Sequence, residues 1–291
     1  MSDASPFPPT APPPRPVSAG LYLVATPIGN LRDMTLRGLD VLAAADLVLA
    51  EDTRVSAKLL AAYGLKARLE RCDDHASARA AELAVARIAE GAVVALVSDA
   101  GTPLVSDPGF VVARAVIAAG LPIHPIPGAS SLLAALCLAG LPVDRVIFAG
   151  FLPPKSAARK SALAGLAEPG RTLVVFESGP RLAASLADMA EVLGDRPAAV
   201  TRELTKLHEE CLRGTLSELA VHPRTQAPKG EIVVVVGPGE AVETSADDVD
   251  AALSEALTRL APGPAAAEVA KQTGANRKAL YARALDMKAA G

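Results

Sequence analysis

Carboxylates, hydroxyls and glycines recur in this chain of 291 residues at the points where apolar runs end. The run at residues 92–97 has the length and β-branching of a buried strand, and the loop SDAGTP (residues 98–103) follows it directly. A second polar loop, SDPG (residues 106–109), then precedes a helical run. Glycine lets backbone amides approach a ligand closely, and a carboxylate accepts hydrogen bonds from hydroxyl or ammonium groups. The two loops predict a ligand site, unless Ser106 or Asp107 only caps the helix.

Three further loops follow short apolar runs in the same way. They are TPIGNL at residues 26–31, EDTR at residues 51–54 and GASS at residues 128–131. The charges of EDTR fit an active site or, equally well, a helix N-terminus, where the helix dipole favours acids. The serines of GASS fit a polar ligand or a plain N-cap. No loop has the spacing of a GxGxxG fingerprint or a P-loop, so dinucleotide or ATP phosphate binding is not indicated.

Strands and helices alternate four or five times in the first half of the chain, which predicts an α/β fold with a mainly parallel sheet. In such a sheet, ligands bind at the carboxyl ends of the strands, where these loops lie. A second α/β unit begins near residue 143 and closes after the apolar run at residues 232–236. We therefore expect an N-terminal α/β domain at residues 20–129 and a C-terminal one at residues 130–240.

The two ends of the chain differ from this pattern. Residues 1–19 are rich in proline and predict a disordered tail. Residues 246–288 are rich in alanine and leucine and predict three helices, with a break at residues 273–276 as in a helix-turn-helix. The basic residues suited to a recognition helix there are Arg277, Lys278 and Arg283. A plain helical cap fits this extension equally well.

The overall composition limits the classes of function. A net charge of −3 and an aromatic content of 3% argue against a protein that coats nucleic acid without specificity. The three cysteines form no C-x-x-C pair and the four histidines are scattered, so we expect no metal site. No secretory signal or membrane span is recognisable, which favours a cytoplasmic protein.

Seven motifs, read in order, carry a resemblance to a known family. They are TPIGNL (26–31), AEDTR (50–54), SDAGTP (98–103), SDPG (106–109), GFLP with Lys155 (150–155), RELT (202–205) and KGE (229–231). The set resembles the bacterial small-subunit ribosomal RNA methyltransferase I family, within the tetrapyrrole-methylase superfamily. The C-terminal extension resembles that family's helix-turn-helix segment.

The resemblance implies an S-adenosylmethionine-dependent enzyme that methylates the ribose 2′-hydroxyl of a cytidine in 16S rRNA, in the decoding centre of the small ribosomal subunit. It also implies a homodimer, and a cofactor held in a cleft between the two α/β domains without a metal. By matching position, the cofactor contacts would be Pro27, Asp99, Gly101, Thr102, Ser130, Ser131, Phe176, Leu204 and Gly230.

Methyl transfer from a sulfonium is an in-line displacement, so positioning supplies most of the catalysis. A carboxylate could accept the proton of the 2′-hydroxyl, and we expect Glu51 or Asp52 to do so. The basic residues Arg54, Lys155, Arg159 and Lys160 are the expected contacts to RNA phosphates. The competing interpretation of Asp52 and Arg54 is a helix cap with an ion pair.

Two other functions remain open on the sequence alone. A methyltransferase that acts on tetrapyrroles or other small molecules would share the fold and the cofactor loops, but would not need the basic segment or the C-terminal helices. A nucleic-acid-binding regulator without enzymatic activity would use the helix-turn-helix and treat the α/β part as a ligand sensor.

Overall fold

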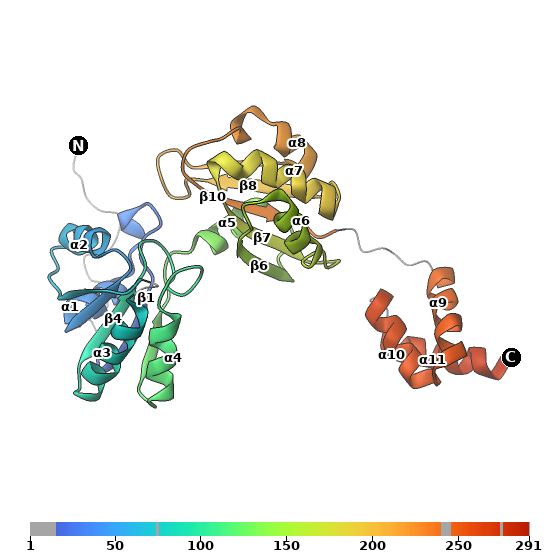
Figure 1. The fold of residues 1–291 in the computed structure, drawn as a ribbon, viewed down its shortest axis with the longest axis horizontal. Helices are drawn as coiled ribbons and strands as arrows, with labels where there is room; N and C mark the ends of the chain where they lie inside the picture. Colours follow the sequence, from blue (N-terminus) through green and yellow to red (C-terminus); the bar gives the residue numbers. More distant parts are fainter. Residues whose placement is uncertain (1–15, 74–75, 240–245, 274–275, 291) are drawn as a thin grey trace, which may run out of the picture. The chain divides into compact units, whose positions relative to one another are not determined.

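The computed structural model describes residues 16–73, 76–239, 246–273 and 276–290 (Figure 1). Residues 1–15, which make up most of the predicted disordered tail, and residues 274–275 of the predicted helix-turn-helix break lie outside these ranges. The chain divides into two compact units. The first contains both β-sheets and the second contains the last three helices.

The first sheet has five parallel strands in the order β3-β2-β4-β1-β5. Its strands are β1 (Gly20–Val24), β2 (Leu47–Ala50), β3 (Leu69–Arg71), β4 (Val93–Val97) and β5 (Ile123–Ile126). The connecting helices are α1 (Leu36–Ala44), α2 (Thr53–Ala62), α3 (Ser77–Ala89) and α4 (Phe110–Ala118). The predicted parallel α/β sheet is therefore confirmed.

Alternating side chains of this sheet bury against helices on both of its faces. Leu47 and Leu49 pack in one core with residues of α3 and α4. Val48 and Ala50 pack in another core with residues of α1 and α2. Because side chains alternate across a strand, a run that is apolar at every position predicts a sheet covered on both sides.

The second sheet has five strands in the order β6-β7-β10-β8-β9, and only β6 and β7 are parallel. Its strands are β6 (Val146–Phe151), β7 (Thr172–Ser178), β8 (Pro197–Arg202), β9 (Glu210–Thr215) and β10 (Glu231–Val236). Helix α5 (Ser131–Ala139) packs against one face. The other face is covered by α6 (Ser156–Ala164), α7 (Leu182–Leu193) and α8 (Leu216–Val221). Short 3-10 turns are η1 (Leu31–Asp33), η2 (Gly179–Arg181) and η3 (Pro223–Thr225).

The second unit is built on α9 (Ala246–Arg259), α10 (Pro262–Thr273) and α11 (Arg277–Ala290). Leu253, Val269 and Leu280, one from each helix, are almost fully buried in its core. All three basic residues expected on a recognition helix are exposed, and Arg283 also pairs with Asp250 at 2.5 Å. None of the helices in the described ranges is long and apolar enough to cross a lipid bilayer.

Candidate active site

The loops after β1 and β4, two adjacent strands, are joined by main-chain hydrogen bonds. The N–H of Thr26 donates to the carbonyl of Gly101 at 2.9 Å, and the N–H of Gly101 donates back to Thr26 at 3.0 Å. The Thr26 hydroxyl adds a bond to the carbonyl of Ser98 at 3.1 Å. Gly101 has φ +84°, a conformation that favours glycine. The loops after β1 and β4 are therefore held together by hydrogen bonds at the carboxyl edge of the sheet.

The SDPG loop precedes α4, and the sequence left open whether Ser106 or Asp107 caps this helix. Helix α4 begins at Phe110, and its N-cap is Gly109 in a left-handed conformation (φ +116°) with no side-chain cap bond. Ser106 and Asp107 therefore do not cap this helix, because the glycine turn separates them from its first N–H groups. The capping role is therefore wrong, and the ligand site stays the predicted role of this loop.

A pocket of about 410 Å3 opens against these loops and is lined by residues of both sheets. Six of its lining residues were predicted as site residues, namely Glu51, Asp99, Ser131, Phe176, Leu204 and Gly230. Its volume lies within the usual range for small-molecule sites, about 300 to 1,000 Å3. Leu204 also shares an apolar cluster with Ile28 of the β1 loop, so the β8–β9 loop packs against the first sheet's loops.

A smaller pocket of about 60 Å3 shares Ala100, Asp107, Ser131 and Phe176 with the larger one. Its lining adds the predicted residues Gly101, Thr102 and Ser130. Ser130 caps α5 by accepting a bond from the N–H of Leu133 at 3.4 Å, and the Thr102 hydroxyl donates to the carbonyl of Ala129 at 3.3 Å. Pro27 is buried and lines neither pocket.

Several carboxyl groups line the larger pocket. Glu51, Asp99 and Asp107 all line it. Burial, together with the charges of Glu51 and Asp99, raises the pKa of Asp107 to about 6. Asp107 was not predicted as a site residue, although its loop was singled out in the sequence. An acidic lining of this kind suits a cationic ligand.

Asp52 takes the cap and ion-pair role that was the competing interpretation. Its Oδ1 accepts the N–H of Arg54 at 2.8 Å and caps α2, while Oδ2 pairs with Nη2 of Arg54 at 2.5 Å. The Arg54 guanidinium holds the pKa of this carboxyl well below its usual range. The N–H of Asp52 donates to Oδ1 of Asp99 at 3.0 Å, so the residue also helps to place a pocket carboxylate. A carboxylate stabilised in this way is a weak proton acceptor.

The four predicted RNA contacts lie in different surroundings. The Arg54 side chain is 87% exposed, and Lys155 is exposed at the N-cap of α6. Lys160 is partly exposed and pairs with Glu191 at 2.6 Å. Arg159 is buried, at 3% exposure, and pairs with Asp188 at 2.6 Å. Its burial contradicts the expected contact between Arg159 and RNA phosphates, because its donors are used inside the protein.

The pocket also has an apolar wall. Phe176 and Leu204 of this wall were predicted as site residues, whereas Phe151 was not. Phe176 packs edge-on against Phe151 with ring centroids 5.6 Å apart, and both line the pocket. Gly230 has φ +103°, and a Cβ there would lie 2.5 Å from Glu203 Oε1, so only glycine fits. A ligand with an aromatic ring and a positive charge fits the apolar wall, the carboxylates and the glycine turns together.

Comparisons with known proteins agree with this geometry. Residues 20–220 match the family "Tetrapyrrole (Corrin/Porphyrin) Methylases", and residues 243–288 match the family "RsmI C-terminal HTH domain". The solved methyltransferase CobJ shares the fold with a TM-score of 0.58 at 20% identity, over 76% of this chain and 95% of that one.

Several curated relatives carry the name ribosomal RNA small subunit methyltransferase I. The protein of Erythrobacter litoralis is 53% identical over 275 residues, which cover 94% of this chain and 97% of the relative. The protein of Mesorhizobium japonicum is 50% identical over 278 residues, with 95% of each chain covered. The sequence resemblance is thus confirmed, and the chain is a member of the ribosomal RNA small subunit methyltransferase I family of tetrapyrrole methylases.

Proposed function

We propose that this protein transfers a methyl group from S-adenosylmethionine to the ribose 2′-hydroxyl of a cytidine in the 16S rRNA of the small ribosomal subunit. The main support is one pocket of about 410 Å3, lined by loops of both sheets, in a chain that is 53% identical to a ribosomal RNA small subunit methyltransferase. We further propose that the enzyme works in the cytoplasm, as a homodimer and without a metal.

The described residues fit the cofactor. S-adenosylmethionine supplies an activated methyl group bound to a positively charged sulfur. Asp99 at the pocket edge would face its positive charge, and Phe176 and Leu204 would cover its apolar parts. Gly230 lines the larger pocket and Gly101 the smaller one, so neither position places a side chain in the space for the cofactor. Thr102, Ser130 and Ser131 would supply polar contacts next to the pocket.

Glu51 is the proposed acceptor of the ribose proton. It lines the same pocket as the cofactor residues, whereas Asp52 is occupied by Arg54 and by the α2 cap. A positioned carboxylate that accepts a proton contributes about 10² to 10⁴ in rate. Asp52 then acts indirectly, through its N–H bond to Asp99.

RNA would be held by the exposed Arg54 and Lys155 and by the partly exposed Lys160. Phosphate contacts of this kind position an RNA and give little sequence information. With a net charge of −3 and few aromatic residues, we infer that the protein recognises the shape of an assembled subunit and not a free single strand. Arg277 and Lys278 of α11 are proposed as additional contacts.

The test uses the purified protein, radiolabelled S-adenosylmethionine and small subunits from a strain that lacks the endogenous methylase. We expect label in 16S rRNA at a linkage that resists alkaline hydrolysis, because a 2′-O-methyl group blocks attack by that oxygen. Tight cofactor binding without label on the subunits would instead indicate a methyltransferase for small molecules. Absence of cofactor binding would refute the proposal as a whole.

A further inference from the structure

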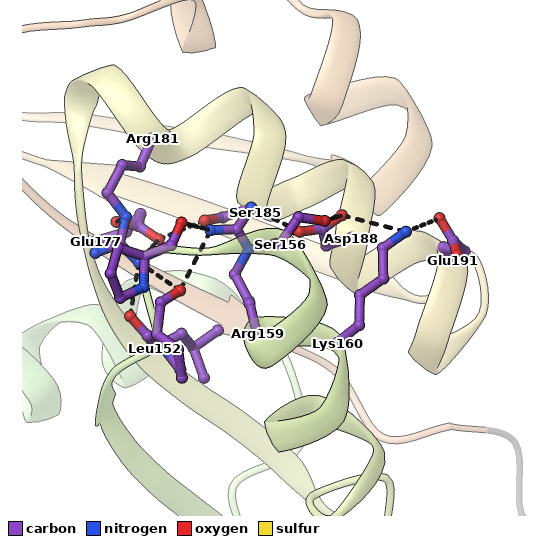
Figure 2. A network of polar contacts seen from close by, with 11 residues as sticks. Leu152, Ser156, Arg159, Lys160, Glu177, Arg181, Ser185, Asp188 and Glu191 are labelled. Carbon is purple, nitrogen blue, oxygen red and sulfur yellow. Dashed lines mark hydrogen bonds and ion pairs between the residues drawn. The ribbon is translucent and has the colours of Figure 1, made fainter.

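A row of buried charges crosses the second sheet's helices beside the GFLP motif (Figure 2). Arg159 of α6 pairs with Asp188 of α7, and Arg181 pairs with Glu177 at the end of β7, with Nε 3.2 Å from Oε1. Arg159, Asp188 and Glu177 are at most 7% exposed. A buried ion pair is weak support for stability compared with apolar packing, so the function of this row needs another explanation.

The guanidinium groups have donors left after pairing, and these reach three consecutive carbonyls. Arg159 Nη1 donates to the carbonyl of Pro154 at 3.1 Å and, at 3.4 Å, to that of Pro153. Arg181 Nη2 donates to the carbonyl of Leu152 at 2.7 Å and to that of Pro153 at 3.3 Å. Prolines have no N–H, so Pro153 and Pro154 can be held through their main chain only by donors to their carbonyls.

The carboxylates in turn fix the two arginines. Asp188 also accepts a bond from the Ser156 hydroxyl at 3.0 Å, and Glu177 accepts bonds from the Ser185 hydroxyl and from the N–H of Ser178. Each guanidinium is planar and presents its donors in a fixed fork. When a carboxylate holds some of the N–H donors of a guanidinium, the position of its remaining donors is therefore fixed as well.

The held segment connects two residues of the proposed site. Phe151, before it, lines the pocket, and Lys155, after it, is an exposed N-cap residue of α6. We propose that Arg159 and Arg181 are positioning residues, which hold the carbonyls of Leu152, Pro153 and Pro154 and thereby place Phe151 at the pocket and Lys155 toward the RNA. The part that concerns Lys155 rests on the proposed function.

The test compares Arg159→Lys with a matched control. Lysine keeps the positive charge opposite Asp188, but one ammonium cannot reproduce the fork that reaches the carboxylate and the carbonyls. Arg196→Lys is the control, because Arg196 also holds a carbonyl, that of Leu193 at 2.7 Å, and lies outside the site. Hydrogen exchange is measured on the free protein for the amides of Phe151, Leu152, Lys155 and Ser156. We expect faster exchange of these amides in Arg159→Lys alone.

Kinetics with small subunits then test the consequence. We expect Arg159→Lys to raise KM for subunits roughly tenfold with a smaller change in kcat, since a displaced contact weakens substrate positioning. In a Lys155→Met background the same change should add little, because the contact that it displaces is already gone. Arg196→Lys should change neither constant.

Three outcomes separate the possibilities. Unchanged exchange in Arg159→Lys would overturn the proposal at its first step. Faster exchange with unaltered KM, or with effects that multiply fully in the double variant, would overturn the positioning of Lys155. If the unmodified protein methylates no subunits, the proposed function fails, and the exchange data on the free protein still decide whether the arginines hold the segment.

Discussion

The two sides of the site handle charge in opposite ways. On the side of the first sheet, Glu51, Asp99 and Asp107 place like charges around one pocket, and the pKa of Asp107 rises to about 6. On the side of the second sheet, the buried Arg159 pairs with Asp188 and the partly buried Arg181 pairs with Glu177. Acids that lie close together favour the binding of a cationic ligand. Arginines that are paired with carboxylates can instead hold main-chain carbonyls in a fixed position. Four predictions test this contrast.

The largest effect is expected where a buried pair is broken. Asp188→Leu should lower the free energy of unfolding by about 3 to 5 kcal/mol, because it leaves the Arg159 guanidinium buried without its carboxylate. Arg159→Met combined with Asp188→Leu should recover most of that loss, since the remaining site is apolar. Denaturant unfolding of the three proteins measures this, and a double variant as unstable as Asp188→Leu would contradict it.

The next effect concerns turnover. Glu51→Gln should lower kcat by about a hundredfold or more, with cofactor affinity retained, because an amide cannot accept the ribose proton. Asp52→Asn should stay near the normal rate. Rates on small subunits and titration calorimetry with the cofactor measure the two quantities. Near-normal turnover in both variants would exclude both acids as the base.

The like-charged side should gain stability when one charge is removed. The pKa of Asp107 is raised to about 6 in the folded protein, so its ionised form opposes folding above that pH. Asp107→Asn should therefore stabilise the protein by about 1 to 3 kcal/mol at pH 8. The gain should shrink as the pH falls from 6 to 4 and should vanish below about pH 3, where the carboxyl is protonated in both states. Thermal unfolding as a function of pH gives the difference, and a gain that is constant with pH would contradict this origin.

The smallest effect is expected at the surface pair of Asp52 and Arg54. The pKa of Asp52 is lowered in the folded state, so its charge stabilises the fold above the unfolded pKa of about 4, and that contribution is lost as the pH falls from there through the folded-state pKa. Asp52→Asn keeps a capping oxygen and should lower Tm only slightly at pH 7. The difference in Tm should be constant above about pH 5 and should narrow steadily as the pH is lowered below about 4. A pH series of melting curves measures it, with Asp195→Asn as a second surface acid of lowered pKa.

Much of the first sheet could be predicted from the sequence because each strand there is a short apolar run that ends in turn residues. β4, for example, was expected from the apolar run at residues 92–97 and spans Val93–Val97. The second sheet was harder, since its order depends on antiparallel pairing between β10 and both β7 and β8, which are distant in sequence. The predicted border between the α/β domains at residues 129 and 130 stays a prediction.

The role of single charges was the least predictable part of the site. Arg159 is next to Lys160 and follows Lys155, so the segment looks like a basic surface in sequence. Its partner Asp188 is 29 residues further along the chain, and only the packing of α6 on α7 brings the two together. Asp107 belonged to a recognised loop, but its raised pKa depends on burial and on Glu51 and Asp99, which other loops supply.

The reciprocal bonds between Thr26 and Gly101 use main-chain atoms only. Substitution of neighbouring side chains therefore leaves these two bonds in place, whereas insertion or deletion of one residue in the SDAGTP loop would shift their register. The length of each loop is therefore a quantity that natural selection must preserve here, together with the glycine at position 101, whose φ is +84°.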